Sequence, residues 1–202
     1  DTEVVLHGYM EWGAEVLKKL RGMFAFVIWD KERRELFGAR DPFGIKPFYY
    51  AQMGELFFFG SECKSFLPHP GFQKELNPNA LKLYLTFQYS ALNESFFKGV
   101  YRLLPGHYLI HREGRTELAS YHAFSFAPEQ MPLEQRAARI REVVAESVKA
   151  HEISDVEVGS FLSGGIDSSV IAALSRPDKT YSVGFENRGF DETGEAKALC
   201  EE

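Results

Sequence analysis

The chain has 202 residues, 45% of them hydrophobic and 26% charged, so its composition is that of a folded protein with one large or two modest domains. Its formal net charge of −6 argues against a nucleic-acid-binding groove, which needs a basic surface. Its two cysteines, Cys63 and Cys200, are too few for a disulfide framework and favour a reducing, cytoplasmic setting, and no run of about 18 apolar residues predicts a membrane span.

The first elements are predicted to be a helix and a strand. Residues 2–20 have a helical pattern that we expect to break at Gly13. Residues 22–30, with the sequence GMFAFVIWD, are apolar on both faces, which predicts a strand that is covered on both sides. Residues 41–44, DPFG, suit a type I turn because proline stands second and glycine fourth.

Further strands are predicted downstream of this turn. Residues 45–50 and 56–59 are expected to pair, and residues 99–124 are expected to hold two strands joined by a turn at residues 113–114. A short helix is predicted over residues 80–88, between these pairs. Because short turns join four successive strands, over residues 22–30, 36–40, 45–50 and 56–59, we expect an antiparallel sheet.

The composition changes after Phe126. Residues 127–154 are predicted to be a linker followed by an amphipathic helix, and residues 155–202 to begin a second domain. The predicted elements of this second domain are a strand over 156–162, a glycine-containing loop, a helix over 166–175 and a strand over 180–185. A strand–loop–helix–strand unit of this kind predicts a parallel sheet.

The loop within FLSGGIDSSV, residues 161–170, has the features of an anion-binding site. A strand that ends in Ser163-Gly164-Gly165 and turns directly into a helix presents backbone N–H groups and the positive end of the helix dipole, which favour phosphate. The loop lacks the lysine of a Walker A sequence. Because the carboxylate of Asp167 would repel a pyrophosphate without a cation between them, its presence predicts a bridging Mg²⁺.

Each candidate residue also has a purely structural interpretation. The loop could be a tight turn with serine caps, but the strand–loop–helix context of the full string favours nucleotide binding. Cys63 is expected to be a buried, inert thiol and Cys200 a helix core position. His107 and His111 share a predicted strand face, but zinc sites need three or four ligands, so zinc is disfavoured.

Several motifs together resemble one enzyme family. SGGIDSS, residues 163–169, resembles the SGGxDS pyrophosphate loop of the N-type ATP pyrophosphatases, and GMFAFVIWD, RDPFGIKPFYY, NPNALKLYLTFQYS and LPGHYL resemble the glutaminase half of the glutamine-hydrolysing asparagine synthetases. The resemblance covers nearly the whole chain. It implies an α+β fold, a partial Ntn-hydrolase αββα sandwich, in residues 1–126. Residues 155–202 would then be the start of an α/β, parallel-sheet ATP pyrophosphatase domain of the PP-loop type.

This resemblance implies two linked activities. In the family, a class II amidotransferase domain hydrolyses glutamine to ammonia, and a synthetase domain uses ATP to convert aspartate to β-aspartyl-AMP and pyrophosphate. Ammonia passes through an internal tunnel and attacks the adenylate, giving asparagine. The implied substrates are glutamine, aspartate and ATP, with Mg²⁺ as cofactor. Family members are commonly homodimers, and we expect neither a nucleic-acid nor a membrane partner.

The resemblance also assigns site residues. Those matched to ATP and pyrophosphate binding are Leu162, Ser163, Gly164, Gly165, Asp167, Ser168 and Val183. Within this set, Gly165 supplies the turn and Asp167 the Mg²⁺ ligand. Asp1 matches the acidic residue that pairs with the α-amino group of glutamine.

We expect the chain to be a piece of a longer protein, because it starts without Met in one helical pattern and stops in another. The family's glutaminase nucleophile is an N-terminal cysteine, which is missing, so no catalytic residue is predicted in this chain and neither reaction is expected of it alone. Two alternatives stay open. One is a related amidotransferase or β-lactam synthetase acting on another carboxylate, and the other is a nucleotide-binding module without turnover.

Overall fold

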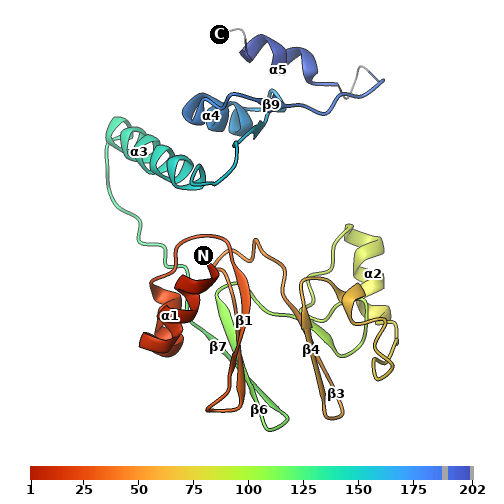
Figure 1. Ribbon diagram of the computed structural model, residues 1–202. Helices are drawn as coiled ribbons and strands as arrows, with labels where there is room; N and C mark the ends of the chain where they lie inside the picture. The colour runs from red at the N-terminus through yellow and green to blue at the C-terminus, as the bar shows by residue number, and fades with distance from the viewer. Residues whose placement is uncertain (188–190, 201–202) are drawn as a thin grey trace. The chain divides into compact units, whose positions relative to one another are not determined.

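The computed structural model describes residues 1–187 and 191–200, which separate into two compact units, Asp1–Phe126 and Ala127–Glu202 (Figure 1). Among the described helices, none combines the length and the hydropathy that a membrane span requires. The first unit contains two antiparallel sheets, and the second contains a short parallel strand pair with helices.

The chain begins with helix α1, Thr2–Trp12, and the 3-10 helix η1, Gly13–Lys18. The predicted break at Gly13 is confirmed, since this residue adopts a φ of 56° that favours glycine. Both helices pack on one sheet through Tyr9, Val16 and Leu17, which are buried. The Tyr9 ring stacks on Phe37 of that sheet with centroids 4.8 Å apart.

The sheet beneath α1 has four antiparallel strands in the order β1-β2-β6-β7. Its strands are β1 (Ala25–Asp30), β2 (Glu35–Arg40), β6 (His107–Arg112) and β7 (Arg115–Ser120). The β2–β6 pairing joins Leu36 to His111, so the centre of the sheet is built from residues far apart in the sequence. The predicted turn at residues 113–114 between β6 and β7 is confirmed.

A second antiparallel sheet has the order β4-β3-β5. Its strands are β3 (Tyr49–Met53), β4 (Leu56–Gly60) and β5 (Val100–Arg102). On one face, Phe66 and Phe72 pack beside the short 3-10 helix η2, Cys63–Ser65. The remaining helix of this unit is α2, Pro78–Phe87, which the side chain of Asn77 caps.

The two sheets share a core made by Phe48, Leu103 and Leu109, against which residues of both sheets pack. Successive residues of β2 point to opposite faces of the sheet, so this strand contributes to two hydrophobic cores. Phe37 and Ala39 face α1, whereas a Cβ at Gly38 would lie 2.8 Å from the Phe48 ring. Glycine at position 38 therefore lets the ring approach the β2 backbone.

Three expectations for this unit need correction. The strand expected over 45–50 begins only at Tyr49, because the preceding residues form a turn around Asp41. The four N-terminal strands divide between two sheets, and Val100–Arg102 forms an additional strand, β5, that pairs with β3. The strand expected over 22–30 begins at Ala25 and is covered incompletely, since Trp29 is 51% exposed.

The turn that follows β2 is organised by the buried carboxylate of Asp41. Its Oδ1 accepts hydrogen bonds from the N–H groups of Phe43 and Ile45 at 3.1 and 3.0 Å, and its Oδ2 accepts one from Lys46 at 3.0 Å. The predicted turn is confirmed by a 3.0 Å bond from the Gly44 N–H to the Asp41 carbonyl. Asp41 is fully buried, so its charge is stabilised by these backbone donors.

The side chain of Arg40 also stabilises this turn. Its guanidinium donates to the carbonyl oxygens of Gly44 and Lys46 at 2.6 and 2.7 Å, and to that of Leu103 at 2.7 Å. Leu103 directly follows β5, so this one side chain links the end of β2 to the second sheet.

The second unit contains helices α3 (Leu133–His151), α4 (Ile166–Ser175) and α5 (Thr193–Cys200), with strands β8 (Ser160–Phe161) and β9 (Thr180–Tyr181). The predicted parallel pairing is confirmed, since Ser160 lies opposite Thr180 and Phe161 opposite Tyr181. Both strands are shorter than expected. The expectation for Cys200 is wrong: it is exposed, and Ala196 is the buried residue of α5.

Candidate functional site

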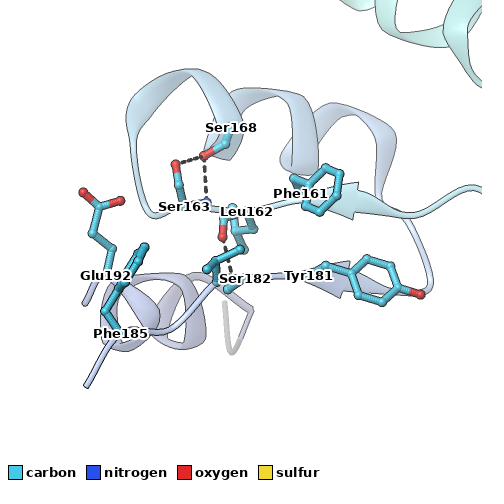
Figure 2. Close-up of a pocket in the computed structure, with 9 residues that line it drawn as sticks. Phe161, Leu162, Ser163, Ser168, Tyr181, Ser182, Phe185 and Glu192 are labelled. Carbon is cyan, nitrogen blue, oxygen red and sulfur yellow. Dashed lines mark hydrogen bonds between the residues drawn. The ribbon is translucent and has the colours of Figure 1, made fainter. Parts of the chain in front are cut away.

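The glycine-containing loop lies between β8 and α4, as predicted (Figure 2). Leu162 extends the parallel pair by one hydrogen bond, from its N–H to the Tyr181 carbonyl at 2.9 Å, and its side chain is buried. Residues 163–165 then turn the chain, and α4 begins at Ile166 with Gly165 as its N-cap. The free N–H groups at such a helix start favour an anion.

Two serine hydroxyls fix the shape of the loop. The Oγ of Ser168 donates to the Gly165 carbonyl at 3.1 Å and accepts from the Ser163 N–H at 3.2 Å. The Oγ atoms of Ser163 and Ser168 lie 3.0 Å apart, and Figure 2 shows the two side chains pointing toward one another. The loop is therefore held in shape by its own side chains.

Gly164 is required by two features of the loop. Its φ of +77° lies in the left-handed region that favours glycine, and a Cβ there would lie 2.7 Å from the Cβ of Glu195 in α5. Gly165 differs, because its φ is −73° and a Cβ would lie 3.4 Å from the Ser163 Oγ, an ordinary contact. The loop geometry therefore requires glycine at position 164 but would accept a small side chain at position 165.

We expect Gly164→Ala to destabilise the loop and its contact with α5 by about 2–3 kcal/mol, from the left-handed backbone and the steric clash together. Gly165→Ala is the matched control and should cost less than about 1 kcal/mol. Amide hydrogen exchange of residues 160–185 measures the difference. If the amides were equally protected from exchange in the two variants, α5 would not pack closely on Gly164.

A pocket of about 230 Å³ lies beside the loop. It is lined by Phe161, Leu162, Ser163, Ser168, Tyr181, Ser182, Val183, Phe185 and Glu192. Four of the sequence-predicted site residues are thus brought together: Leu162, Ser163, Ser168 and Val183. Gly164, Gly165 and Asp167 belong to the adjoining loop and first helical turn but are not among the lining residues.

The other lining residues were missed by sequence reasoning. Three of them lie close to Val183 in the sequence YSVGF: Tyr181, Ser182 and Phe185. Their position next to a predicted site residue could have indicated that they line the same pocket. Glu192 gave no such signal, because it lies far from the loop in the sequence, just before α5, and comes near Gly164 only in the folded structure.

Asp167 lies in the first turn of α4 and is exposed. A single carboxylate beside an anion-binding helix start fits the way in which Mg²⁺ is held, by one or two carboxylates with phosphate oxygens supplying other ligands. In the part of the chain that the structure describes, no group of three or more His, Cys, Asp or Glu side chains could hold a metal by itself.

Asp1 belongs to the first unit, where it caps α1. Its carboxylate accepts a hydrogen bond from the Thr2 N–H at 2.6 Å. It also lines a cavity of about 730 Å³ together with residues of α1 and β1 and the exposed Lys46. The acidic residue that the sequence matched to glutamine binding thus lies at a cavity large enough for an amino acid.

The residues considered as alternative sites have structural partners. Burial raises the pKa of the Cys63 thiol, which makes the thiolate less available. The Nδ1 of His107 contacts the Pro105 carbonyl at 2.8 Å. The His111 ring stacks on Phe57 with centroids 4.0 Å apart, and its Nδ1 lies 2.9 Å from the Thr116 Oγ1. These contacts account for both histidines within the fold of the first unit, whereas Cys63, which was expected to be buried, is only partly buried.

Comparison with known proteins gives two family matches. Residues 1–122 match the family described as glutamine amidotransferase domain, and residues 139–202 match the family described as asparagine synthase.

Named relatives are similar along the whole chain. Asparagine synthetase [glutamine-hydrolyzing] 1 of Bacillus subtilis (strain 168) is 42% identical over 98% of this chain and 32% of its own length. A putative asparagine synthetase [glutamine-hydrolyzing] of Mycobacterium bovis is 41% identical over the whole chain and 33% of its own length. The chain therefore spans about a third of the length of these relatives.

Among solved structures, glutamine phosphoribosylpyrophosphate amidotransferase from B. subtilis aligns with a TM-score of 0.39 at 19% identity, over 93% of this chain and 40% of that one.

Proposed function

Because this chain belongs to the glutamine amidotransferase domain family, we propose that it is part of a glutamine-hydrolysing asparagine synthetase. The full-length enzyme would use ATP to activate aspartate as β-aspartyl-AMP and would amidate it with ammonia from glutamine. The observation that carries the proposal is the pairing, in one chain, of an amidotransferase match with a strand–loop–helix anion site inside an asparagine synthase match. Similarity to relatives of that name over the whole chain supports it.

We propose the domain assignment on the same grounds. Residues 1–126 would form part of an Ntn-hydrolase αββα sandwich, which the core shared by the two sheets and the packing of α1 and η1 on the first sheet support. Residues 127–154 would be linker and helix, and residues 155–202 the start of a PP-loop ATP pyrophosphatase domain. The parallel β8–β9 pair supports this last assignment.

In this proposal, each loop residue has a role in binding ATP. The backbone of Val183 would face the adenine, and Leu162, Ser163, Gly164 and Ser168 would contact ATP and its pyrophosphate, with Gly165 supplying the turn. Asp167 would hold Mg²⁺, which neutralises phosphate charge and makes pyrophosphate a better leaving group. The protein's own contribution is to fix these donors before the nucleotide arrives.

For the glutaminase half, we propose that Asp1 pairs with the α-ammonium group of glutamine at the cavity beside β1. No residue of this chain is assigned as the nucleophile. A cytoplasmic homodimer is part of the same proposal.

The products of the full-length protein test this function. With ATP, aspartate and glutamine, we expect AMP, pyrophosphate and asparagine in equal amounts, with pyrophosphate release dependent on aspartate. ADP as product would reject adenylation. Pyrophosphate release dependent on another carboxylate would indicate a related amidotransferase or β-lactam synthetase, and nucleotide binding without product would indicate a binding module.

A further inference from the structure

Beside the loop, the short parallel strand pair β8–β9 is extended by a hydrogen bond from a side chain rather than from the backbone. The β8–β9 ladder contains only two residue pairs. One position beyond it, the Oγ of Ser182 donates a 2.6 Å hydrogen bond to the Leu162 carbonyl, which is the last carbonyl before the glycine-containing loop (Figure 2). Together with the 2.9 Å bond from the Leu162 N–H to Tyr181, it ties both polar groups of Leu162 to the β9 segment.

This bond fixes the orientation of the first donor in the loop. The carbonyl of Leu162 and the N–H of Ser163 belong to the same peptide group, and in a trans peptide they point in opposite directions. With the carbonyl held by Ser182, the Ser163 N–H must point away from β9. It points to the Oγ of Ser168, at 3.2 Å, on the inner side of the loop.

We propose that Ser182 is a positioning residue for nucleotide binding, which orients the Leu162–Ser163 peptide so that the Ser163 N–H holds the Ser168 Oγ and keeps the Ser163 and Ser168 hydroxyls together at the pocket, where they would bind the phosphates of ATP. The inference rests on the proposed nucleotide site but assigns Ser182 a role that the sequence did not give it. Without the Ser182 hydroxyl, this peptide can rotate, the Ser163 N–H no longer holds the Ser168 Oγ, and the two loop hydroxyls lose their preorganised position. Ser182 acts through the Leu162 carbonyl and is not a catalytic residue.

The competing interpretation is that Ser182 only supports the wall of the pocket, which it also lines. The two interpretations differ in the part of the nucleotide that is affected. Loss of the oriented pair of loop hydroxyls weakens binding of phosphate groups, whereas loss of the pocket wall weakens binding of the nucleoside as well. Comparing inorganic pyrophosphate, ATP and adenosine separates them.

The test uses Ser182→Thr and Ser182→Val in the full-length protein, because these side chains have the same shape and differ by one hydroxyl. Equilibrium dialysis measures the dissociation constants of ATP, pyrophosphate and adenosine in the presence of Mg²⁺. We expect the Val variant to bind ATP and pyrophosphate about 3- to 10-fold more weakly, the range for one hydrogen bond, with adenosine unchanged. The Thr variant should bind all three like wild type.

In steady-state assays, the Val variant should raise the KM for ATP by a similar factor and leave the KM for aspartate and glutamine unchanged. The proposal is overturned if ATP affinity stays within 2-fold of wild type, if adenosine binding weakens as much as pyrophosphate binding, or if Thr behaves like Val. If the Val variant does not fold, by circular dichroism, Ser182→Ala replaces it under the same criteria. Because dialysis requires no turnover, failure of the proposed reaction would leave this result interpretable.

Discussion

We expect the Asp167→Asn variant of the full-length protein to release pyrophosphate at about one hundredth of the wild-type rate or less. Asparagine has the size of aspartate but no charge, so it is a poor ligand for Mg²⁺. Charge neutralisation by a metal is worth several kcal/mol in phosphoryl chemistry, and each ~1.4 kcal/mol is a factor of ten in rate. Asp167 is exposed in the first turn of α4, so we expect the fold to tolerate the change.

The control for this variant is Asp178→Asn, the same change at an exposed carboxylate in the segment between α4 and β9. It should keep wild-type activity. ATP binding measured with and without Mg²⁺ supplies a readout independent of turnover. The enhancement of binding by Mg²⁺ should shrink for Asp167→Asn and persist for Asp178→Asn. Wild-type turnover in the Asp167 variant would show that its role is wrongly assigned.

The second large effect is expected at Asp41, whose replacement by alanine should lower the free energy of unfolding of the first unit by about 3–5 kcal/mol. The change leaves three backbone N–H groups without their carboxylate acceptor at a fully buried position. Asp41→Asn is the matched variant. It keeps an oxygen for Phe43 and Ile45 but places an amide opposite the Lys46 N–H, so we expect a smaller loss of about 1–3 kcal/mol.

The measurement can be confined to the first unit, because the chain has two tryptophans, Trp12 and Trp29, and both lie there. Urea unfolding followed by tryptophan fluorescence therefore reports on this unit. Equal midpoints for wild type and the alanine variant would contradict the role given to Asp41.

The same carboxylate makes stability depend on pH. Burial by itself raises the pKa of Asp41, but hydrogen bonds from the N–H groups of Lys46, Ile45 and Phe43 outweigh it and hold the pKa below its ordinary value. A lowered pKa in the folded state contributes stability above the unfolded-state pKa of about 3.9, and this contribution is lost as the pH falls below it. The urea midpoint should fall less between pH 6 and pH 3 in Asp41→Asn than in wild type.

Local features of this fold were predictable from the sequence. The start of α4, the turn at residues 113–114 and the parallel connection through the glycine-containing loop were all predicted, because glycine, capping and hydrophobic periodicity act over a few residues. The prediction that Ser163 and Gly164 help to bind an anion was local in the same sense. It needed only the order of strand, glycine and helix.

What the sequence could not reveal depends on distant partners. The division of the strands between two sheets rests on pairings such as Leu36 with His111 and Ala51 with Val100, which no short pattern encodes. β5 has three residues, too few for a visible alternation. The role inferred for Ser182 likewise rests on a carbonyl 20 residues away.

The order of strands in the first sheet also has a consequence for synthesis on the ribosome. The β1–β2 hairpin emerges early, but the free edge of β2 is covered only when His111 has been made to pair with Leu36. At about 5–20 residues per second, this edge stays open for roughly 4–15 s. A nascent chain in that interval carries an unpaired, apolar strand edge, which is a template for aggregation. Chaperone dependence should therefore be greatest in chains that have completed β2 but not β6.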